Sequence, residues 1–299
     1  MTGTNRKPRA LHCQMIQAGE ITAIVGDASR DGIGGTQYCG LWSLTSKHWP
    51  FNAFGNTYAG LLPGEIRSKA PKLEIVNATT CALAKRATKQ YPVDVRATYQ
   101  VKAPYYVDHV LRFTDHESML SSRMYPGADF REVSWCCYMN CPADPRLHFL
   151  SGGKWYRYIS PLHGVGSRIT PGYISDGELE MFPPQKDRQP FHTDRIRDRF
   201  DEPFYYGRVD KMVLILIFDQ PRWIRFFCSP SGGGESLRLG DACPAWDFEY
   251  VIPAREYKVG RRYEVRMRLV YKKYESDDDV LREYHKAQKD LRFERPGKR

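Results

Sequence analysis

Apolar and polar residues alternate along most of the chain, which is the pattern of β-strands with one buried face. The segment 132–140, EVSWCCYMN, places Val133, Trp135 and Cys137 on one side and polar residues on the other. The segment 261–274 alternates in the same way over a greater length. Further strands are predicted within 20–27, 37–46, 72–87, 94–102, 105–115, 146–160, 211–219, 222–230 and 246–253.

Only one segment shows the spacing of an amphipathic helix. This segment, 276–291, begins with a serine and three aspartates, which suit a helix N-terminus. Many strands followed by a single helix favour an all-β fold: a large antiparallel β-sandwich with a short C-terminal helix. We therefore expect a basic arm at 1–19, the sandwich domain at 20–274, and the helix with a basic tail at 275–299.

The positions of charged and apolar residues argue against several classes of protein. The chain of 299 residues has a formal net charge of +10, but much of the excess lies at its two ends, and no nucleic-acid-binding motif is visible. Solvated basic ends therefore explain the charge better than a nucleic-acid groove does. The sequence has no apolar run of about 18 residues and no apolar signal core near its start, so we expect neither a membrane span nor export.

The eight cysteines are scattered through the chain, unlike those of a small disulfide scaffold. Cys136, Cys137 and Cys141 stand close together, but neighbouring strand residues point to opposite faces and no second CxxC pair exists. We expect free thiols and a cytoplasmic location. No HExxH or HxH spacing is present, so neither a metal nor another cofactor is predicted; only His192 and Asp194 leave a metal ion open.

Residues able to move protons lie in and beside the irregular segment 160–208, which is too long for a plain connection. His163 stands in a glycine-containing loop, where a small pKa shift would let it act as an acid or a base; the alternative is that it only fixes its own loop. Tyr205 and Tyr206 come where this segment enters a strand. One ring can pack there while the other turns its hydroxyl into a cleft.

A second group surrounds a predicted hairpin at 146–160. Asn140, Arg146 and His148 supply planar donors near aromatic residues, as a sugar site requires, although the same residues suit the polar outer face of a hairpin. Asp108 shares a strand face with an arginine, either as an exposed ion pair or as one wall of a polar cleft.

Several segments together resemble one known superfamily. They are GLWSLTSKHWPFNAFGNTYAGL near the start, then YYVDHVLRFTD, DPRLHFLSGGKW, HGVGS, FYYGRVDKMVLILIFD, and the closing run SPSGGG…PAWDFEYVIP…VGRRYEVRMRLVYK. Over most of 20–274 the chain resembles bacterial β-sandwich proteins of the galactose-mutarotase-like superfamily, which includes aldose 1-epimerases and the supersandwich domains of polysaccharide lyases and glycosidases. The resemblance implies a twisted antiparallel supersandwich with a carbohydrate cleft on its concave face.

Epimerases of that superfamily use a histidine acid and a carboxylate base, and His163 and Asp247 match these roles by residue type. We therefore expect a catalytic set of His163, Tyr206 and Asp247, with Trp246 as a platform for a pyranose ring. On a regular strand Trp246 and Asp247 point to opposite faces, so a shared cleft requires a bulge. Otherwise Trp246 belongs to the core and Asp247 caps a turn.

The sequence thus predicts a carbohydrate-active protein that takes a mono- or oligosaccharide. The favoured form is an enzyme that uses acid/base chemistry as an epimerase, a glycosidase or a lyase. The alternative is a carbohydrate-binding β-sandwich without turnover, and an oligomer is left open. Buried, closely spaced titratable groups would indicate catalysis, whereas an open aromatic platform would indicate binding. The substrate-binding residues expected are Arg146, His148, Asn140, Trp246, Tyr205 and Asp108.

Overall fold

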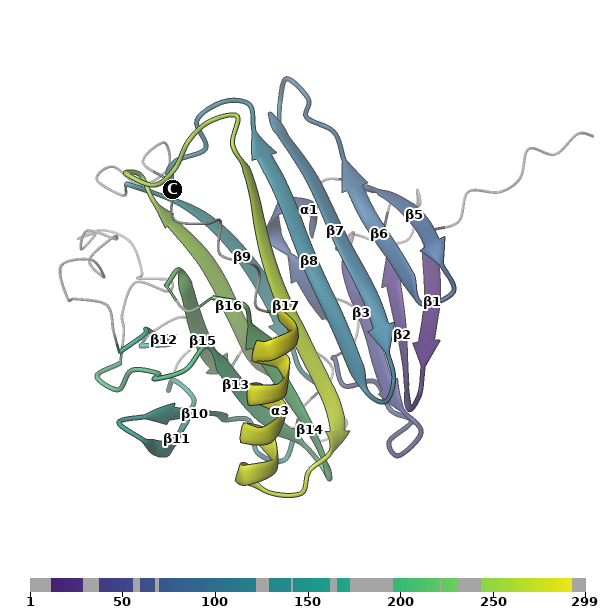
Figure 1. The fold of residues 1–299 in the computed structure, drawn as a ribbon, viewed down its shortest axis with the longest axis vertical. Coiled ribbons are helices and arrows are strands. Elements are labelled where there is room, and N and C mark those ends of the chain that lie inside the picture. Colours follow the sequence, from purple (N-terminus) through teal and green to yellow (C-terminus); the bar gives the residue numbers. More distant parts are fainter. Residues whose placement is uncertain are drawn as a thin grey trace, which may run out of the picture.

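The strands form two antiparallel sheets packed face to face, with a helix lying on one outer face (Figure 1). The structure is a computed structural model that describes residues 12–28, 38–55, 60–67, 70–121, 129–140, 142–161, 166–172, 196–220, 222–230 and 243–291. The first sheet has eight described strands, in the order β1 (Cys13–Ala18), β2 (Ile21–Gly26), β3 (Gly40–Ser46), β4 (Gly60–Pro63), β9 (Phe130–Tyr138), β16 (Pro244–Pro253), β15 (Ile224–Pro230) and β12 (Arg168–Ile169).

The second sheet has nine described strands, and the described helices are a single turn, α1 (Gly64–Arg67), and the longer α3 (Asp277–Leu291). The predicted antiparallel sandwich with a C-terminal helix is therefore confirmed. β1 lies inside the segment 1–19 that was expected to be a basic arm, so the sandwich begins earlier than predicted. The nine strands follow the order β11 (Lys154–Tyr158), β10 (Leu147–Ser151), β13 (Phe204–Val209), β14 (Met212–Phe218), β17 (Arg262–Lys273), β8 (Tyr106–Asp115), β7 (Val93–Lys102), β6 (Thr80–Lys85) and β5 (Lys72–Asn77).

The core between the sheets is built from the apolar side of each alternating strand. Trp135 of β9 stacks on Phe248 of β16, with ring centroids 4.9 Å apart, and Tyr205 of β13 lies among the same buried residues. The Tyr205 hydroxyl donates a hydrogen bond to the carbonyl of Trp246 in the opposite sheet, at 2.7 Å. This bond and the aromatic contacts fix how β13 faces β16.

Gly207 of β13 makes room for the largest side chain of this core. A Cβ atom at position 207 would lie 2.1 Å from the ring of Trp246, which is fully buried. We expect Gly207→Ala to lower the free energy of unfolding by about 1–3 kcal/mol, because the indole must shift within a close-packed core. Urea denaturation measures this, with Gly172→Ala as a comparison whose new Cβ would meet no atom closer than 3.5 Å. An unchanged midpoint for Gly207→Ala would contradict the packing.

Helix α3 covers part of the outer face of the nine-stranded sheet, across β14 and β17 (Figure 1). The Ser276 hydroxyl caps the helix by accepting a hydrogen bond from the Asp279 amide at 3.2 Å. Val280 and Tyr284 pack against apolar residues of the sheet in a second buried cluster, separate from the main core. Because the helix shields this face, strands such as β13 and β14 are apolar on both sides.

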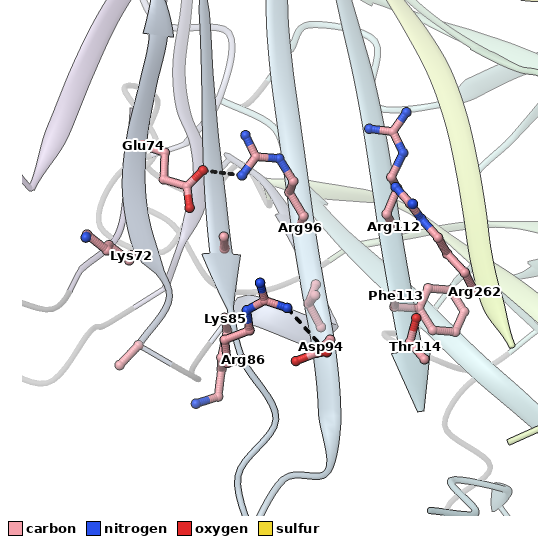
Figure 2. A pocket seen from close by; sticks show the side chains of 13 residues that line it. Lys72, Glu74, Lys85, Arg86, Asp94, Arg96, Arg112, Phe113, Thr114 and Arg262 are labelled. Carbon is pink, nitrogen blue, oxygen red and sulfur yellow. Dashed lines mark hydrogen bonds and ion pairs between the residues drawn. The ribbon is translucent and has the colours of Figure 1, made fainter. Parts of the chain in front are cut away.

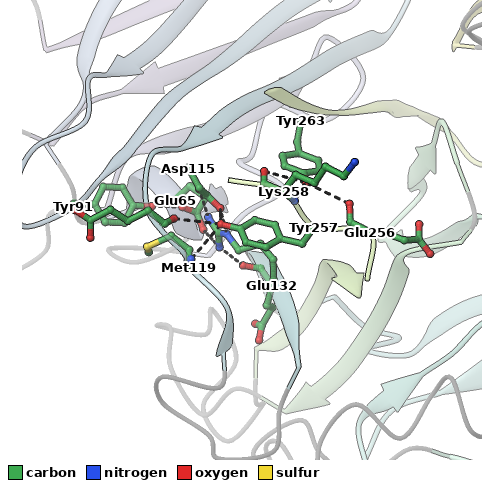
Figure 3. Close-up of polar contacts among 11 residues, drawn as sticks. Glu65, Tyr91, Asp115, Met119, Glu132, Glu256, Tyr257, Lys258 and Tyr263 are labelled. Carbon is green, nitrogen blue, oxygen red and sulfur yellow. Dashed lines mark hydrogen bonds and ion pairs between the residues drawn. The ribbon is translucent and has the colours of Figure 1, made fainter. Parts of the chain in front are cut away.

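A buried ionic cluster joins α1, β8 and β9 (Figure 3). Arg131 of β9 is 4% exposed and forms ion pairs with Asp115 at 2.7 Å and Glu65 at 3.0 Å. Tyr257 donates to Asp115 at 2.9 Å, and Tyr91 donates to Glu65. The carboxylates of this cluster are thus occupied by Arg131 and the tyrosine hydroxyls.

The cysteines differ from the expectation that all are free. Six described cysteines carry free thiols, but Cys243 is disulfide-bonded. The prediction failed because it relied on the scattered positions of the cysteines and on the lack of a visible export signal, neither of which reports how close two sulfur atoms come in the fold. A disulfide takes two of the eight cysteines, so we expect thiol titration of the denatured, unreduced protein to count six. A count of eight would contradict the disulfide.

Candidate functional site

Three of the predicted site residues come together on the outer face of the nine-stranded sheet. His148 of β10 is paired in register with Tyr206 of β13, and their rings meet edge to face with centroids 4.5 Å apart. Arg146 forms a two-pronged ion pair with Asp144, which also lies 3.4 Å from the His148 ring nitrogen Nε2. The Tyr206 hydroxyl, however, donates to Asp277 at the start of α3. These contacts anchor the helix and occupy the hydroxyl.

The titration properties of this group fit a structural role. Burial lowers the pKa of His148, so its ring is neutral near neutral pH. The pKa of Asp144 is lowered to about 2, because hydrogen bonds and charge from Arg146 outweigh its partial burial. Hydrogen bonding to Asp277 adds to burial in raising the pKa of Tyr206 far above its usual value. None of the three changes its protonation state near neutral pH.

Two residues expected to bind substrate lie in the core instead. Trp246 and Tyr205 are both fully buried between the sheets, where the Trp246 indole nitrogen donates to the Pro145 carbonyl at 2.9 Å. The expectation that Trp246 forms a sugar platform is therefore wrong. β16 is a continuous strand, and its larger apolar side chains turn inward.

The remaining predicted binding residues lie apart from one another. Asp108 of β8 forms ion pairs with Arg268 and Lys102, both at 2.6 Å, on the outer face of the nine-stranded sheet. Asn140 follows β9 and donates to the Asn52 carbonyl at 3.2 Å. His163, His192 and Asp194 lie outside the described residues, and within the described part of the chain no group of metal-binding side chains gathers.

Asp247 lies on the opposite side of the molecule from Tyr206. Trp246 and Phe248 of β16 point into the core, so Asp247 points out of the eight-stranded sheet, whereas Tyr206 points out of the nine-stranded sheet. Packed sheets are about 10 Å apart, and these two side chains point away from each other. The structure therefore does not bring Tyr206 and Asp247 into one site.

Around Asp247, the outer face of the eight-stranded sheet carries charged residues in cross-strand rows. Glu249 of β16 lies opposite Arg225 of β15 on one side and opposite Ser134 of β9 on the other. Glu132 stands two residues along β9 from Ser134, which makes it a diagonal neighbour of Glu249 at a Cβ separation of about 7 Å. Acidic and basic groups thus share one sheet face. We call this set the outer-face site: Glu132, Asp247, Glu249, Arg67, Arg168 and Arg225.

The two glutamates of the outer-face site have raised pKa values. Burial is the main cause for both, and the nearby charge of Glu132 raises the pKa of Glu249 further, while Arg225 and Arg168 oppose the rise. Glu249 is 3% exposed, and its Oε1 atom has no hydrogen-bond partner among the described residues. A carboxyl group in this condition holds its proton near neutral pH and has an oxygen available to a ligand.

Asp247 is held in place by the backbone of the neighbouring strand. Its Oδ1 atom accepts a hydrogen bond from the Cys137 amide at 2.7 Å, while the Trp246 carbonyl accepts its bond from Tyr205 in the other sheet. The Asp247 carboxylate thus acts as one of the hydrogen-bond acceptors between β16 and β9. Burial raises its pKa to about 7, although the Cys137 amide and the Arg67 charge pull the value down.

Arg67 brings a third element, α1, to the site. Its guanidinium lies 3.8 Å from the centre of the Tyr38 ring and 5.9 Å from that of Tyr138, and it donates to the Cys136 sulfur at 2.9 Å. The Nε atom of Arg67 is buried without a partner among the described residues. Stacked guanidinium and phenol groups offer both flat surfaces and donors for a polar ligand.

Sequence reasoning named Asp247 but missed the residues beside it. Glu249 and Asp247 occupy the same polar side of 246–253, so the alternation in that strand already paired them. What distinguishes this strand is that both of its faces are buried although one of them carries two acidic side chains. Glu132 and Arg67 gave no comparable signal, because their approach depends on how β9 and α1 pack beside β16.

Several solved structures match the chain at low sequence identity. Solved structures that match include an Escherichia coli protein provisionally assigned as an aldose 1-epimerase, with 10% identity, a TM-score of 0.47, and coverage of 88% of this chain and 99% of that chain. An aldose epimerase homologue from C. elegans matches with 10% identity, a TM-score of 0.46, and coverage of 88% and 100%. Heparan sulfate lyase from Pedobacter heparinus matches with 8% identity, a TM-score of 0.48, and coverage of 86% and 34%.

These values concern the fold alone. The strand pairing itself shows the antiparallel β-sandwich, and at these TM-scores membership of the galactose-mutarotase-like superfamily stays a prediction of the sequence resemblance. No protein-family model and no curated protein sequence matches the chain. Among the described residues, no helix is long and apolar enough to cross a membrane.

Proposed function

We propose that the protein is an enzyme that binds a carbohydrate at the outer-face site and acts on it by proton transfer between carboxyl groups. The observation that carries this proposal is that Glu249, Glu132 and Asp247 share one sheet face and all have raised pKa values. Carboxyl groups that titrate near neutral pH can give or accept a proton under working conditions.

The arrangement supports distinct roles for the two glutamates. Glu249 is the more deeply buried, so it is the proposed acid that protonates a ring or leaving-group oxygen. Glu132 is only half-buried, so it is the proposed base, acting on a hydroxyl group or on water. A diagonal separation of about 7 Å lets two carboxyl groups reach opposite sides of one sugar ring carbon.

The surrounding groups suit a polyhydroxylated ligand. Asp247 supplies a carboxyl oxygen as an acceptor, and the guanidinium of Arg67 supplies charged donors, for hydroxyl groups. The Tyr38 and Tyr138 rings near Arg67 supply apolar faces for a pyranose. Glycoside hydrolysis uses such a carboxyl pair, and acid/base epimerisation needs a proton donor and a proton acceptor that the same pair can supply. The separate position of Tyr206 gives no support to a tyrosine-dependent elimination.

A panel of mono- and oligosaccharides followed by proton NMR tests this function. We expect at least one sugar to show accelerated interconversion of its anomers or cleavage of its glycosidic bond, with the acceleration lost in Glu249→Gln. Line broadening without any change in the sugar would instead favour the non-catalytic carbohydrate-binding protein. The absence of both turnover and binding across the panel would contradict the proposal.

The raised pKa of Asp247 has a consequence for stability. An aspartate in the unfolded chain has a pKa of about 3.9, whereas folding raises that of Asp247 to about 7. The folded protein therefore holds an extra proton between these values, and this contribution to the free energy of unfolding falls as pH rises from about 4 to 7.

We expect Asp247→Asn to lose this contribution while keeping an oxygen that accepts the Cys137 hydrogen bond. Urea denaturation at pH 5 and pH 8 should show that wild type loses more stability with rising pH than the variant does. An equal loss in both proteins would mean that Asp247 has an ordinary pKa.

A further inference from the structure

The other sheet carries a separate hollow whose charged lining residues are mainly basic (Figure 2). The hollow has a volume of about 610 Å³ and lies on the outer face of the nine-stranded sheet, over β5, β6, β7, β8 and β17. It takes no part in the outer-face site, which belongs to the eight-stranded sheet. The basic residues that line it are Lys72, Lys85, Arg86, Arg96, Arg112 and Arg262.

The strand register concentrates these charges in a row. Arg96 of β7 lies directly opposite Arg112 of β8, and on its other side it lies opposite Ala84 of β6, which in turn faces Lys72 of β5. Like charges directly opposite each other destabilise a sheet. The small side chain of Ala84 leaves open space between Lys72 and the arginines.

Acidic neighbours neutralise only part of this charge. Arg96 pairs with Glu74 and Arg112 with Glu264, while Arg86 stands 3.7 Å from Asp94. The other three cations, Lys72, Lys85 and Arg262, form no ion pair with any described residue. The six cations and three acids leave a surplus of three positive charges around the hollow.

We propose that this hollow binds a compact anionic ligand that carries two or more phosphate, sulfate or carboxylate groups. Its volume lies in the range of small-ligand pockets, and the guanidinium groups of Arg96 and Arg112 suit two-pronged contacts with oxyanions. The one aromatic lining residue, Phe113, is 1% exposed and offers no surface for stacking a nucleobase. A small polyanion therefore fits better than a nucleic acid strand.

Binding of defined probes to two matched variants tests this site. Isothermal titration calorimetry at 50 and 150 mM salt would use pyrophosphate as the phosphate probe, trigalacturonate as the carboxylate probe, and a DNA duplex as the nucleic acid probe. The test variant is Lys85→Glu/Arg262→Glu. The control is Lys154→Glu/Lys289→Glu, which makes the same change in net charge at exposed positions on β11 and α3, outside the lining of the hollow.

We expect pyrophosphate or trigalacturonate to bind wild type and the control, and the test variant to bind at least tenfold more weakly. Binding should weaken with salt, because the contacts are ionic and partly exposed. Which small probe binds more tightly would identify the source of the anionic groups. Failure of both small probes to bind wild type, equal weakening in test and control variants, or binding of the duplex alone would each overturn the proposal. Circular dichroism would verify that both variants are folded.

Discussion

Replacing Glu249 by glutamine is expected to lower kcat by about 10²–10⁴-fold, the usual contribution of a positioned acid or base. Glutamine keeps the size and hydrogen-bonding capacity of the side chain but cannot transfer a proton. The fold should survive, because Glu249 Oε1 has no partner among the described residues and the change removes a buried ionisable group. Steady-state kinetics on the sugar that the NMR panel identifies would measure the loss.

The matched control is Glu117→Gln, the same chemical change at an exposed position. It should leave kcat and KM unchanged. Glu132→Gln should also lower kcat, and the double variant should be little worse than either single variant, because an acid and a base that act as a unit have non-additive effects. A kcat within threefold of wild type for Glu249→Gln would remove that residue from the chemistry.

Replacing Arg131 by methionine is expected to lower the free energy of unfolding by about 3–5 kcal/mol. The guanidinium forms ion pairs with Asp115 and Glu65, and all three side chains are less than a tenth exposed. Methionine fills a similar volume but leaves two carboxylates buried without their cation, which is the costly way to break a buried ion pair. Urea denaturation monitored by tryptophan fluorescence would measure the change.

The comparison variant is Arg96→Met, which breaks a more exposed ion pair with Glu74 and should cost about 0–1 kcal/mol. Adding Asp115→Asn and Glu65→Gln to Arg131→Met should recover part of the loss, because the unpaired charges are then gone. A loss below about 1 kcal/mol for Arg131→Met, with no recovery in the triple variant, would show that the cluster does not carry this energy.

Local alternation in the sequence was enough to predict most of the strands and one hairpin, although strands such as β1, β4 and β12 fall outside the predicted segments. The run 146–160 predicted a turn at its two glycines, and the structure places Gly152 and Gly153 at φ of +58° and +72° between β10 and β11. Positive φ at both central residues is what a tight hairpin turn requires. Such features depend on residues close in sequence, so a local pattern contains them.

Which strands share a sheet could not be read from the same patterns. Tyr205 and Tyr206 are both aromatic, and nothing local shows that one faces the core and the other lies under α3. The predicted joining of Tyr206 with Asp247 failed for this reason, since β13 and β16 belong to different sheets. The outer-face site likewise depends on strand order, because Glu132 reaches Glu249 only through the pairing of β9 with β16.

The two faces of β16 differ in how far their surroundings could be predicted from the sequence. Trp246, which the sequence reasoning favoured as a sugar platform, packs in the core with Phe248 because apolar surface leaves water, and Asp247 and Glu249 are then forced onto the other face. That second face is also buried, so their pKa values rise. Burial of the polar side depends on the whole fold, and sequence periodicity alone does not report it.

The most direct test of the proposed site is a crystal structure of the Glu249→Gln variant in complex with the sugar found by NMR. The structure should show the sugar on the outer face of the eight-stranded sheet, with the substituted side chain and Glu132 within hydrogen-bond reach of its ring or anomeric oxygens and Asp247 near its hydroxyl groups. A sugar bound beside His148 and Tyr206, or in the cationic hollow of the nine-stranded sheet, would contradict the proposed site.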